Sequence, residues 1–269
     1  MPELPEVETV RAGISPHLIG KKVRGIEVRN ERLRYPIQKE IEKLYKETIH
    51  RVERRAKYLI LYTDHYKVLI HLGMSGSIRI MEDDFELKKH DHFIMQIEGG
   101  EVLVYNDPRR FGFILLYGLD EAIPFLEKLA PEPLSDDFNA ATLYPKLKRR
   151  TRPIKSLLMD QEFVVGAGNI YANESLFMAG IHPERPANNL RKKEVERLVE
   201  EVKKVLARAI VQGGTTLKDF TTPDGSPGYF AQELMVYGQK DQPCMICGTA
   251  IERIVLANRA TYFCVKCQK

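Results

Sequence analysis

The stretch CMICGTAIERIVLANRATYFCVKC, residues 244–267, contains all four cysteines of the 269-residue chain. They form two Cys-x2-Cys pairs with sixteen residues between them, which is the spacing of a zinc ribbon. Each pair directs two thiolates towards one point, and two pairs build a tetrahedral site with Zn–S distances of about 2.3 Å. Because four protein ligands leave no position open for water, we expect one structural Zn²⁺ that holds a hairpin. The predicted ligands are Cys244, Cys247, Cys264 and Cys267, with Arg259 at or near the tip of the hairpin.

The cellular compartment decides between this zinc site and the alternative of two disulfides. The N-terminal segment carries Glu3, Glu6 and Glu8 and has no apolar core, so it lacks the pattern of a signal peptide. No apolar run approaches the roughly 18 residues of a membrane span. We therefore expect a cytoplasmic protein with no membrane association, and a reducing cytoplasm disfavours disulfides.

Positive charge is concentrated in the second half of the chain. Residues 143–269 carry 20 Lys and Arg against 13 Asp and Glu, whereas residues 1–142 carry 21 against 24. The densest basic run, KLKRRTRPIK, spans residues 146–155. Such a run is commonly a solvated face or a linker, but it also fits contact with a polyanion such as nucleic acid.

Helical periodicity marks the segment before the cysteines. Apolar residues recur at helical spacing through residues 195–210, and a Gly-Gly pair ends the pattern. Two earlier helices are expected to flank VVGAGN at residues 164–169. The glycines of this motif allow backbone amides to approach a phosphate, with Asn169 capping the next helix, although a simple interhelical turn explains them equally well. Residues 213–237 show no sustained period, which is typical of a functional or disordered loop.

The first 130 residues have the pattern of short strands. Six segments rich in Val, Ile and Tyr are broken by Gly, Asp or Asn. The segment IEGGEV at residues 97–102 is typical of a hairpin, and the turn-rich stretch PEPLSDDFN at 131–139 is typical of a domain boundary. These patterns predict a β-sandwich or barrel flanked by helix. The six segments are KVRGIEVRN, KYLILYT, KVLIHLG, SIRIM, HFIMQIE and EVLVYND.

The chain opens with MPELPEVETV, in which two Pro-Glu pairs stand within six residues. Proline suits the first turn of a helix, and acidic residues favour its positive end. Val7, Val10, Ile14 and Leu18 follow at helical spacing and predict an amphipathic helix. Glu6 either complements the helix end or is a buried partner, and the sequence leaves both readings open.

Together, these motifs make the sequence resemble the formamidopyrimidine-DNA glycosylases, bacterial enzymes that excise 8-oxoguanine and ring-opened purines. The motifs follow in order along the whole chain, with a proline at position 2. The opening PELPEVE differs from the PEGPEI type of the related endonuclease VIII branch, which prefers oxidised pyrimidines. The motifs are PELPEVE at 2–8, RRAKYLI at 54–60, HLGMSG at 71–76, KHDH at 89–92, NDPRRFG at 106–112, MDQEFVVGAGNIYANE at 159–174, and the C4 ribbon ending in CQK.

The resemblance implies roles for individual residues. Pro2 is the nucleophile once Met1 is removed, and Glu3 is its acid/base partner. Lys57 and Arg259 are linked to phosphate contact and to the elimination steps. Further residues contact the bent DNA, and a Met, an Arg and a Phe among them fill the gap left by an extruded base. These DNA-contacting residues are Met74, His90, Arg109, Phe111, Arg150 and Asn169.

The same resemblance implies an α+β multidomain fold. It comprises an N-terminal β-sandwich flanked by helices (1–131), a helix–two-turn–helix domain with a lesion-reading loop (132–237), and a C-terminal zinc-ribbon hairpin (238–269). The implied activity is that of a bifunctional DNA glycosylase and AP lyase of base excision repair. It would excise oxidised purines through an imine on the N-terminal proline, followed by β,δ-elimination. The implied partner is damaged double-stranded DNA, and the enzyme is expected to be a bacterial, nucleoid-associated monomer.

Taken singly, several motifs have simpler explanations. Met74 in its GMSG turn would be an ordinary core residue, and NDPRRFG could be a plain loop between strands. An apolar wedge beside an arginine is, however, what unstacking of a base pair requires. Two alternatives remain: an endonuclease VIII-like glycosylase for oxidised pyrimidines, and a non-catalytic zinc-ribbon protein that binds bent or damaged DNA. The second alternative has no need of Pro2-Glu3 at a free terminus.

Overall fold

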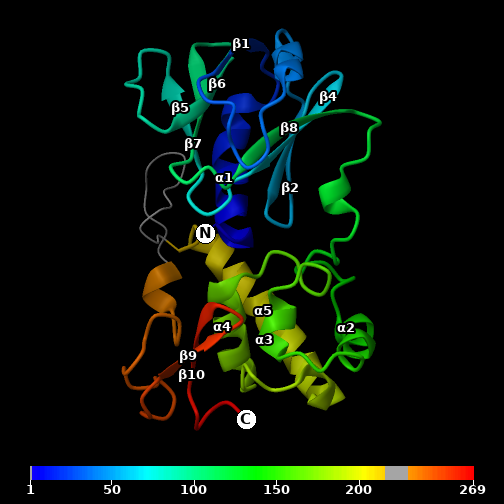
Figure 1. Ribbon diagram of the computed structural model, residues 1–269, viewed down its shortest axis with the longest axis vertical. Coiled ribbons are helices and arrows are strands. Elements are labelled where there is room, and N and C mark those ends of the chain that lie inside the picture. Colours follow the sequence, from blue (N-terminus) through cyan, green and yellow to red (C-terminus); the bar gives the residue numbers. More distant parts are fainter. Residues whose placement is uncertain (1, 216–229) are drawn as a thin grey trace. The chain divides into compact units, whose positions relative to one another are not determined.

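The computed structural model describes residues 2–215 and 230–269 (Figure 1). The chain forms two compact units: Met1–Leu126 with Gln212–Tyr229, and Glu127–Val211 with Phe230–Lys269. Most of the loop predicted at 213–237 therefore lies outside the described residues. Among the described helices, none combines the length and the apolar character needed to cross a membrane.

The first unit begins with the predicted amphipathic helix, α1 (Leu4–Leu18). The prediction of its apolar face is confirmed, because Val7, Val10, Ile14 and Leu18 are all buried. Each fully buried side chain of this size stabilises the fold by about 1.5–3 kcal/mol. The helix thus serves as one wall of the core of the first unit.

Two four-stranded antiparallel sheets form the body of this unit, which confirms the predicted sandwich flanked by helix. One sheet has the order β1-β6-β7-β5 and the other the order β2-β3-β4-β8. The predicted hairpin joins β6 to β7, and Gly99 (φ +101°) and Gly100 (φ +90°) supply the backbone conformation of its turn. The strands are β1 (Val23–Val28), β2 (Arg51–Arg55), β3 (Tyr58–Tyr62), β4 (Tyr66–His71), β5 (Ser77–Glu82), β6 (Asp91–Ile97), β7 (Glu101–Asn106) and β8 (Phe113–Gly118).

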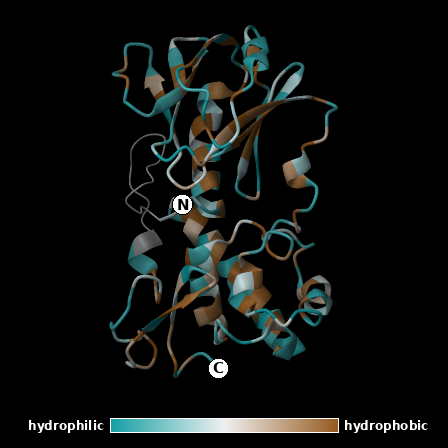
Figure 2. Ribbon diagram, viewed as in Figure 1, coloured by the Kyte–Doolittle hydropathy of each residue, from teal (hydrophilic) through white to brown (hydrophobic). Residues whose placement is uncertain are grey.

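Alternation along the strands places the core between the sheets and α1. In β6, Phe93, Met95 and Ile97 belong to the same apolar cluster as α1, whereas Ile94 joins a smaller cluster with Val102. Successive side chains of a strand point to opposite faces, so this division follows from the pleat. Figure 2 shows strand β8 as mainly apolar and helix α1 as a mixture of apolar and polar residues, which is typical of an amphipathic helix.

Two strands were absent from the predicted set. Strand β2 has the sequence RVERR, whose four charged residues hide the strand pattern. Its pairing with β3 brings Arg51 opposite Tyr62, and the guanidinium lies 4.1 Å from the centre of that ring. Strand β8 contains the apolar run FILLY, which lacks alternation because most of its residues are at least half-buried.

The described part of the second unit contains four α-helices and a two-stranded hairpin, and it confirms the predicted long helix and the helices on either side of VVGAGN. The long helix, α5, buries its apolar stripe and ends before Gly213. Helix α4 ends at Gly180 in the left-handed conformation (φ +65°). The elements are α2 (Ala140–Leu147), α3 (Ile154–Leu158), α4 (Asn169–Ala179), α5 (Lys192–Val211), β9 (Glu252–Leu256) and β10 (Arg259–Phe263).

Candidate active site and nucleic-acid interface

The predicted nucleophile and its partner lie buried at the start of α1. Pro2 is buried and Glu3 is only 2 % exposed. The backbone N–H of Glu3 donates to the Glu6 carboxylate (2.8 Å), which holds the first turn of the helix. The predicted nucleophile and its predicted partner therefore both lie in a region from which bulk water is excluded.

Glu6 combines both roles that the sequence left open. Besides accepting from Glu3, its other oxygen accepts from the backbone N–H (2.8 Å) and the hydroxyl (3.0 Å) of Thr215. The contact is close, because a Cβ at Gly214 (φ +77°) would lie 2.8 Å from the Glu6 carboxylate. The hydrogen bonds of Glu6 thus attach the start of α1 to Thr215.

Lys57 sits in the tight turn between β2 and β3 and is 7 % exposed. The preceding residue, Ala56, adopts a positive φ of +53°. Arg54 stabilises this turn by donating to the Ala56 carbonyl (3.0 Å) and to Glu8 on α1 (2.9 Å). The Glu8–Arg54 ion pair therefore links the helix that begins at the predicted nucleophile to the turn that carries Lys57.

His71 is a site residue that the sequence reading did not single out. Its ring lies 5.1 Å from Tyr58 and stacks on Phe113 at 5.3 Å. Burial, followed by the positive charges of Lys57 and Arg34, lowers the pKa of His71 to about 4, so the ring is neutral at neutral pH. Nδ1 accepts from the Gly73 N–H (3.1 Å), which leaves the proton on Nε2 as a donor.

Met74, Arg109 and Phe111 come from two adjacent turns of the first unit. The backbones of these turns are in contact, since a Cβ at Gly73 (φ +61°) would lie 2.4 Å from both Phe111 and Gly112. The guanidinium of Arg109 lies 4.8 Å from the centre of the Phe111 ring, and Phe111 is 44 % exposed. An exposed aromatic ring with a cation over its face has the form of a wedge that can enter a base stack.

His90 belongs to the same group of turns. Its carbonyl accepts from the backbone N–H of Asp107 (3.1 Å), and its ring lies 6.0 Å from the ring of His92. The structure thus brings together the four predicted DNA contacts of the first unit, although they are as far apart in sequence as positions 74 and 111.

In the second unit, Asn169 does not cap α4, which corrects the sequence prediction. The helix begins at Asn169 itself, and Gly168 occupies the capping position. The side chain of Asn169 instead donates to the carbonyl of Ala260 (3.0 Å). The reason is the nearby β9–β10 hairpin, which offers this carbonyl as an acceptor close to its tip.

Arg259 is the first residue of β10, directly after Ala257 and Asn258 at the tip, as predicted. Its neighbour Ala260 is held from two sides, because Lys155 also donates to the Ala260 carbonyl (3.1 Å). Lys155 is 1 % exposed and donates to the Thr261 hydroxyl as well (2.6 Å). Beside this anchor, Arg259 lines a pocket of about 120 Å³ together with Arg152 and Lys155, a concentration of positive charge that suits an anion.

Glu174 is a second residue that the sequence reading missed. Its carboxylate accepts three backbone N–H groups, from Met235 (2.8 Å), Val236 (3.0 Å) and Tyr237 (2.8 Å). Burial raises the pKa of Glu174, and these three hydrogen bonds oppose the shift. Glu174 therefore fixes the chain that leads to the cysteines against helix α4.

Arg150, the remaining predicted DNA contact, follows α2 in the basic run. Its guanidinium lies 5.6 Å from the centre of the Phe163 ring. Both residues line an open pocket of about 580 Å³ to which Lys146 and Arg149 add positive charge and Glu162 adds one carboxylate. This pocket gives the second unit a basic surface patch.

The four cysteines meet the geometric requirements of a zinc site. Their sulfur atoms all lie within 4.8 Å of one another, with 3.9 Å between Cys244 and Cys267 and 3.4 Å between Cys247 and Cys264. A tetrahedron with Zn–S bonds of about 2.3 Å has S–S edges of about 3.8 Å. The described cysteines form no disulfide. The chain therefore binds one structural zinc ion through this set, as predicted, and the alternative of two disulfides is wrong.

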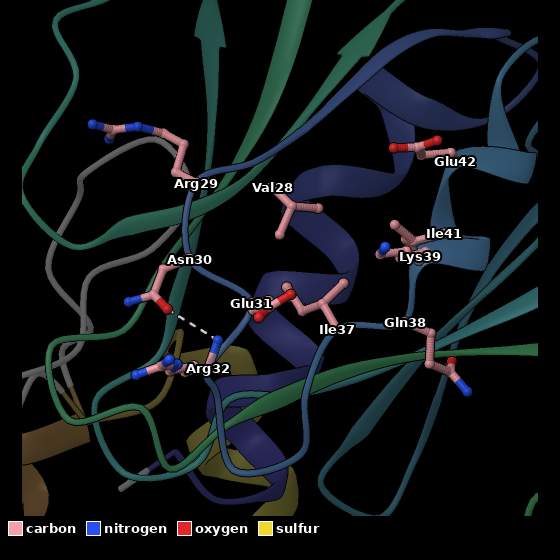
Figure 3. A pocket seen from close by; sticks show the side chains of 10 residues that line it. All are labelled: Val28, Arg29, Asn30, Glu31, Arg32, Ile37, Gln38, Lys39, Ile41 and Glu42. Carbon is pink, nitrogen blue, oxygen red and sulfur yellow. Dashed lines mark hydrogen bonds between the residues drawn. The ribbon is translucent and has the colours of Figure 1, made fainter.

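A further pocket of about 350 Å³ lies between the segment after β1 and the short helix η1 (Lys39–Leu44) (Figure 3). Its wall is shaped by Asn30, whose side chain accepts from the backbone N–H of Arg32 (2.9 Å). Three cationic and two acidic side chains are among its described lining residues, which include none of the predicted site residues. The pocket is thus separate from the candidate active site.

Comparisons with known proteins agree with this arrangement. The family described as "Formamidopyrimidine-DNA glycosylase N-terminal domain" matches residues 1–114, its "H2TH domain" matches 129–221, and the "Zinc finger found in FPG and IleRS" matches 241–269. A formamidopyrimidine-DNA glycosylase of Klebsiella pneumoniae is 53% identical over 269 residues, which is all of both chains.

Two solved structures are also similar over nearly the whole chain. A mutant of the Lactococcus lactis FPG in complex with DNA that contains Fapy-dG has a TM-score of 0.94, with 36% identity and full coverage of both chains. The Lactococcus lactis Fpg in complex with DNA that contains an abasic site has a TM-score of 0.93, with 37% identity over 99% of each chain.

Proposed function

The chain belongs to the formamidopyrimidine-DNA glycosylase family of DNA glycosylases and AP lyases, and we propose that it excises oxidised purines with Pro2 as nucleophile and Glu3 as acid/base partner. The observation that carries this proposal is the buried Pro2-Glu3 pair at the start of α1. The relatives supply the reaction class, and the pair supplies an amine and a proton carrier one residue apart.

The chemistry needs an unprotonated amine that can attack C1′. An α-amino group with a pKa near 7.7–8.0 is about 10–20% neutral at pH 7, whereas a lysine near 10.4 is less than about 0.1% neutral. Removal of Met1 exposes such an amine on Pro2. Attack forms the C1′–N bond and breaks the glycosidic bond, and Glu3 transfers protons during base departure and sugar opening.

The secondary amine of proline favours elimination once the imine has formed. The imine formed on proline is a permanently charged iminium, because its nitrogen has no proton left to lose. This fixed charge withdraws electrons from the neighbouring sugar carbon and promotes loss of its proton. Elimination of the phosphate on one side and then on the other side of the sugar follows, so the strand is cut twice.

The contacts to DNA that we propose follow the roles that the resemblance to the family implies. We assign phosphate contacts to Lys57 in the β2–β3 turn, to Arg259 at the start of β10 and to Asn169 at the start of α4. We assign further backbone contacts to His90 and Arg150. Met74, Arg109 and Phe111 would fill the gap that an extruded nucleotide leaves, since reaching C1′ in a duplex requires extrusion at a cost of a few kcal/mol.

The opposite base would be read by Arg109. An orphaned cytosine offers acceptors at O2 and N3 to the guanidinium, and adenine offers a poorer match. We therefore propose that 8-oxoguanine is removed faster when it lies opposite cytosine than opposite adenine. The loop expected to read the lesion, at 213–237, lies largely outside the described residues.

The organisation of the working enzyme is proposed as follows. We assign functional domains to 1–131, 132–237 and 238–269, and the separate family matches to 1–114, 129–221 and 241–269 support the division. One chain contains the proposed nucleophile and all proposed DNA contacts, which supports a monomer. The relatives are bacterial proteins named for action on DNA, which supports a cytoplasmic enzyme at the nucleoid.

Borohydride trapping tests the nucleophile. The protein is incubated with 8-oxoguanine DNA and sodium borohydride, and the covalent complex is digested and mapped by mass spectrometry. The adduct is expected on Pro2, and intact mass should show that Met1 is absent from the active protein.

Two variants serve as controls for this experiment. A preparation that retains Met1 should form no adduct, because its proline nitrogen is part of an amide. Pro2→Gly keeps an α-amine without the secondary nitrogen, so its trapping should fall without vanishing. An adduct on Lys57 instead of Pro2 would overturn the assignment.

A further inference from the structure

The turns that carry four of the side chains we assign to DNA contact in the first unit share one buried neighbour, Asp107. This residue lies at the end of β7 and is 0 % exposed. Neither the reaction chemistry nor the proposed DNA contacts require it. Its contacts nevertheless reach every turn that carries one of Met74, His90, Arg109 and Phe111.

The carboxylate of Asp107 joins the two turns directly. One oxygen accepts from the Ser75 hydroxyl (2.7 Å), next to Met74. The other oxygen accepts from the Gly112 N–H (2.8 Å), next to Phe111, and from the Tyr105 hydroxyl (3.4 Å). Each oxygen thus holds a different turn, and both turns are tied to strand β7.

The backbone of Asp107 adds the third segment. Its N–H donates to the carbonyl of His90 (3.1 Å), and its carbonyl accepts from the His92 ring (2.9 Å) and from the Arg110 N–H (3.2 Å). Segment 90–92 at the start of β6 is therefore held at the same point as the two turns.

Ser75 completes the connection between the turns. While its hydroxyl donates to Asp107, the same oxygen accepts from the backbone N–H of Arg109 (3.2 Å). The space around these bonds is full, because a Cβ at Gly112 would lie 2.4 Å from the His71 carbonyl. The turns cannot slide past one another without breaking hydrogen bonds to a buried carboxylate, which are among the stronger ones in proteins.

We propose that Asp107 is a positioning residue that makes Met74, Arg109 and Phe111 enter the duplex as one rigid group, aligned with His90. The inference rests on the proposed function of these side chains as a wedge. Asp107 acts through the backbone of the turns and does not touch DNA. Its role is to set the position of Arg109 opposite the estranged base, and so to set the discrimination between cytosine and adenine.

The test compares base excision with cleavage of a pre-formed abasic site under single-turnover conditions. Ser75→Ala removes the hydroxyl that bridges the turns, and Asp107→Asn replaces one accepting oxygen by a donor. Both variants should remove 8-oxoguanine opposite cytosine about tenfold or more slowly, because small misplacements of positioning groups have large kinetic costs. Their preference for cytosine over adenine should shrink. Abasic-site cleavage should fall much less, since no stacked base has to be extruded there.

Thr63→Val is the matched control. Thr63 is 4 % exposed, compared with 7 % for Ser75, and its hydroxyl likewise donates to a carboxylate, that of Glu47 (2.8 Å). It forms this bond at the β3–β4 turn, and its loss should change neither the excision rate nor the cytosine preference. Equal effects of Thr63→Val and Ser75→Ala on both would overturn the inference, because general destabilisation would then explain them.

The outcomes separate this inference from the proposed function. If the wild-type protein traps on Pro2 and the Asp107 and Ser75 variants keep the full rate and cytosine preference, only the positioning role fails. Equal loss of 8-oxoguanine excision and abasic-site cleavage would also overturn that role. Should Asp107→Asn fold poorly, Ser75→Ala alone decides the matter.

Discussion

The wedge turns of the first unit and the β9–β10 hairpin of the second unit are held in place by different means. The turns at 73–76 and 107–112 sit on strands whose alternate residues fill a large apolar core. The hairpin carries Arg259 on short strands with mostly exposed or half-buried side chains. Its Tyr262 packs against a small cluster whose five described buried residues include two cysteines. Burial of apolar side chains can thus hold the wedge turns in place, whereas the hairpin depends on a metal ion and on hydrogen bonds from polar side chains.

Removal of the metal should therefore disrupt the hairpin and leave the wedge turns intact. Among the predictions made here, it should have the largest effect. Cys247→Ser should lose zinc and duplex binding together, because a structural zinc site contributes on the order of 10 kcal/mol to the fold around it. The amides of the β-sandwich should keep their hydrogen-exchange protection. Metal content, duplex binding and exchange mass spectrometry measure the three quantities.

Met245→Ser is the control for this change. Met245 lies between two of the ligands and is 77 % exposed, so zinc and DNA binding should survive its replacement. Freshly purified protein with four free thiols and no bound metal would contradict the account of the hairpin.

The second largest effect is expected from loss of a polar side chain that anchors the second unit. Glu174→Gln keeps an oxygen acceptor but places an NH₂ group against one of the three backbone N–H groups. We expect a loss of about 1–3 kcal/mol in the free energy of unfolding. Exchange at the amides of residues 235–237 should also accelerate.

Glu200→Gln is the matched control for Glu174→Gln. Glu200 is 61 % exposed and pairs with Lys204 on the surface of α5, so its loss should change stability by less than about 1 kcal/mol. Equal losses for the two variants would show that Glu174 has no anchoring role.

Acid should affect the two units in different pH windows. The folded-state pKa of His71 is about 4, while the free value is 6.5, so the unfolded chain binds a proton first. Stability of the first unit should then be complete above pH 6.5 and fall as the pH drops towards 4. A His71 ring that titrates near pH 6.5 by NMR would contradict this.

Glu194 determines the pH range in which the second unit is expected to lose stability. Burial alone would raise its pKa, but hydrogen bonds from Arg185 and Arg191 lower the pKa from 4.5 to about 2. Its contribution should be present above pH 4.5 and be lost as the pH falls towards 2. Lys57→Met should raise the pKa of His71 and leave that of Glu194 unchanged. The pH range in which the first unit loses stability should therefore move further above that of the second unit.

Phosphate contacts should give the smallest and most uniform effects. Lys57→Ala in one unit and Arg259→Ala in the other should each reduce the log–log salt dependence of duplex binding by about one unit. Lys204→Ala, an ion-paired lysine on α5 that is 55 % exposed, should leave the slope unchanged. If either test variant altered lesion preference and kept the salt slope, its assignment to a phosphate would be wrong.

The sequence predicted the parts of the fold that local patterns encode. The stripe of α5, the alternation in β6 and the spacing of the cysteines depend on residues close together in the chain. Strand β2 escaped prediction because Arg51, Glu53, Arg54 and Arg55 give it the composition of an exposed loop. Only pairing with β3 reveals it as a strand.

Positioning residues were missed for a different reason. Asp107 and Glu174 both lie in recognised motifs, but Asp107 binds a serine 32 residues away and Glu174 binds amides 61–63 residues away, so no local pattern indicates their roles. Asn169 lies in a motif that was recognised, but its side chain bonds to Ala260, 91 residues later. Candidate site residues with typical chemistry can thus be proposed from sequence, whereas the hydrogen bonds that align them are visible only in the fold.

Excision of oxidised purines by this chain is best decided by single-turnover cleavage of matched duplexes. The substrates carry 8-oxoguanine opposite cytosine, 8-oxoguanine opposite adenine, or thymine glycol in the same sequence. We expect fastest release of 8-oxoguanine opposite cytosine, much slower release opposite adenine, and cuts on both sides of the sugar. Faster removal of thymine glycol than of 8-oxoguanine would contradict the proposed activity and would show that the enzyme prefers oxidised pyrimidines.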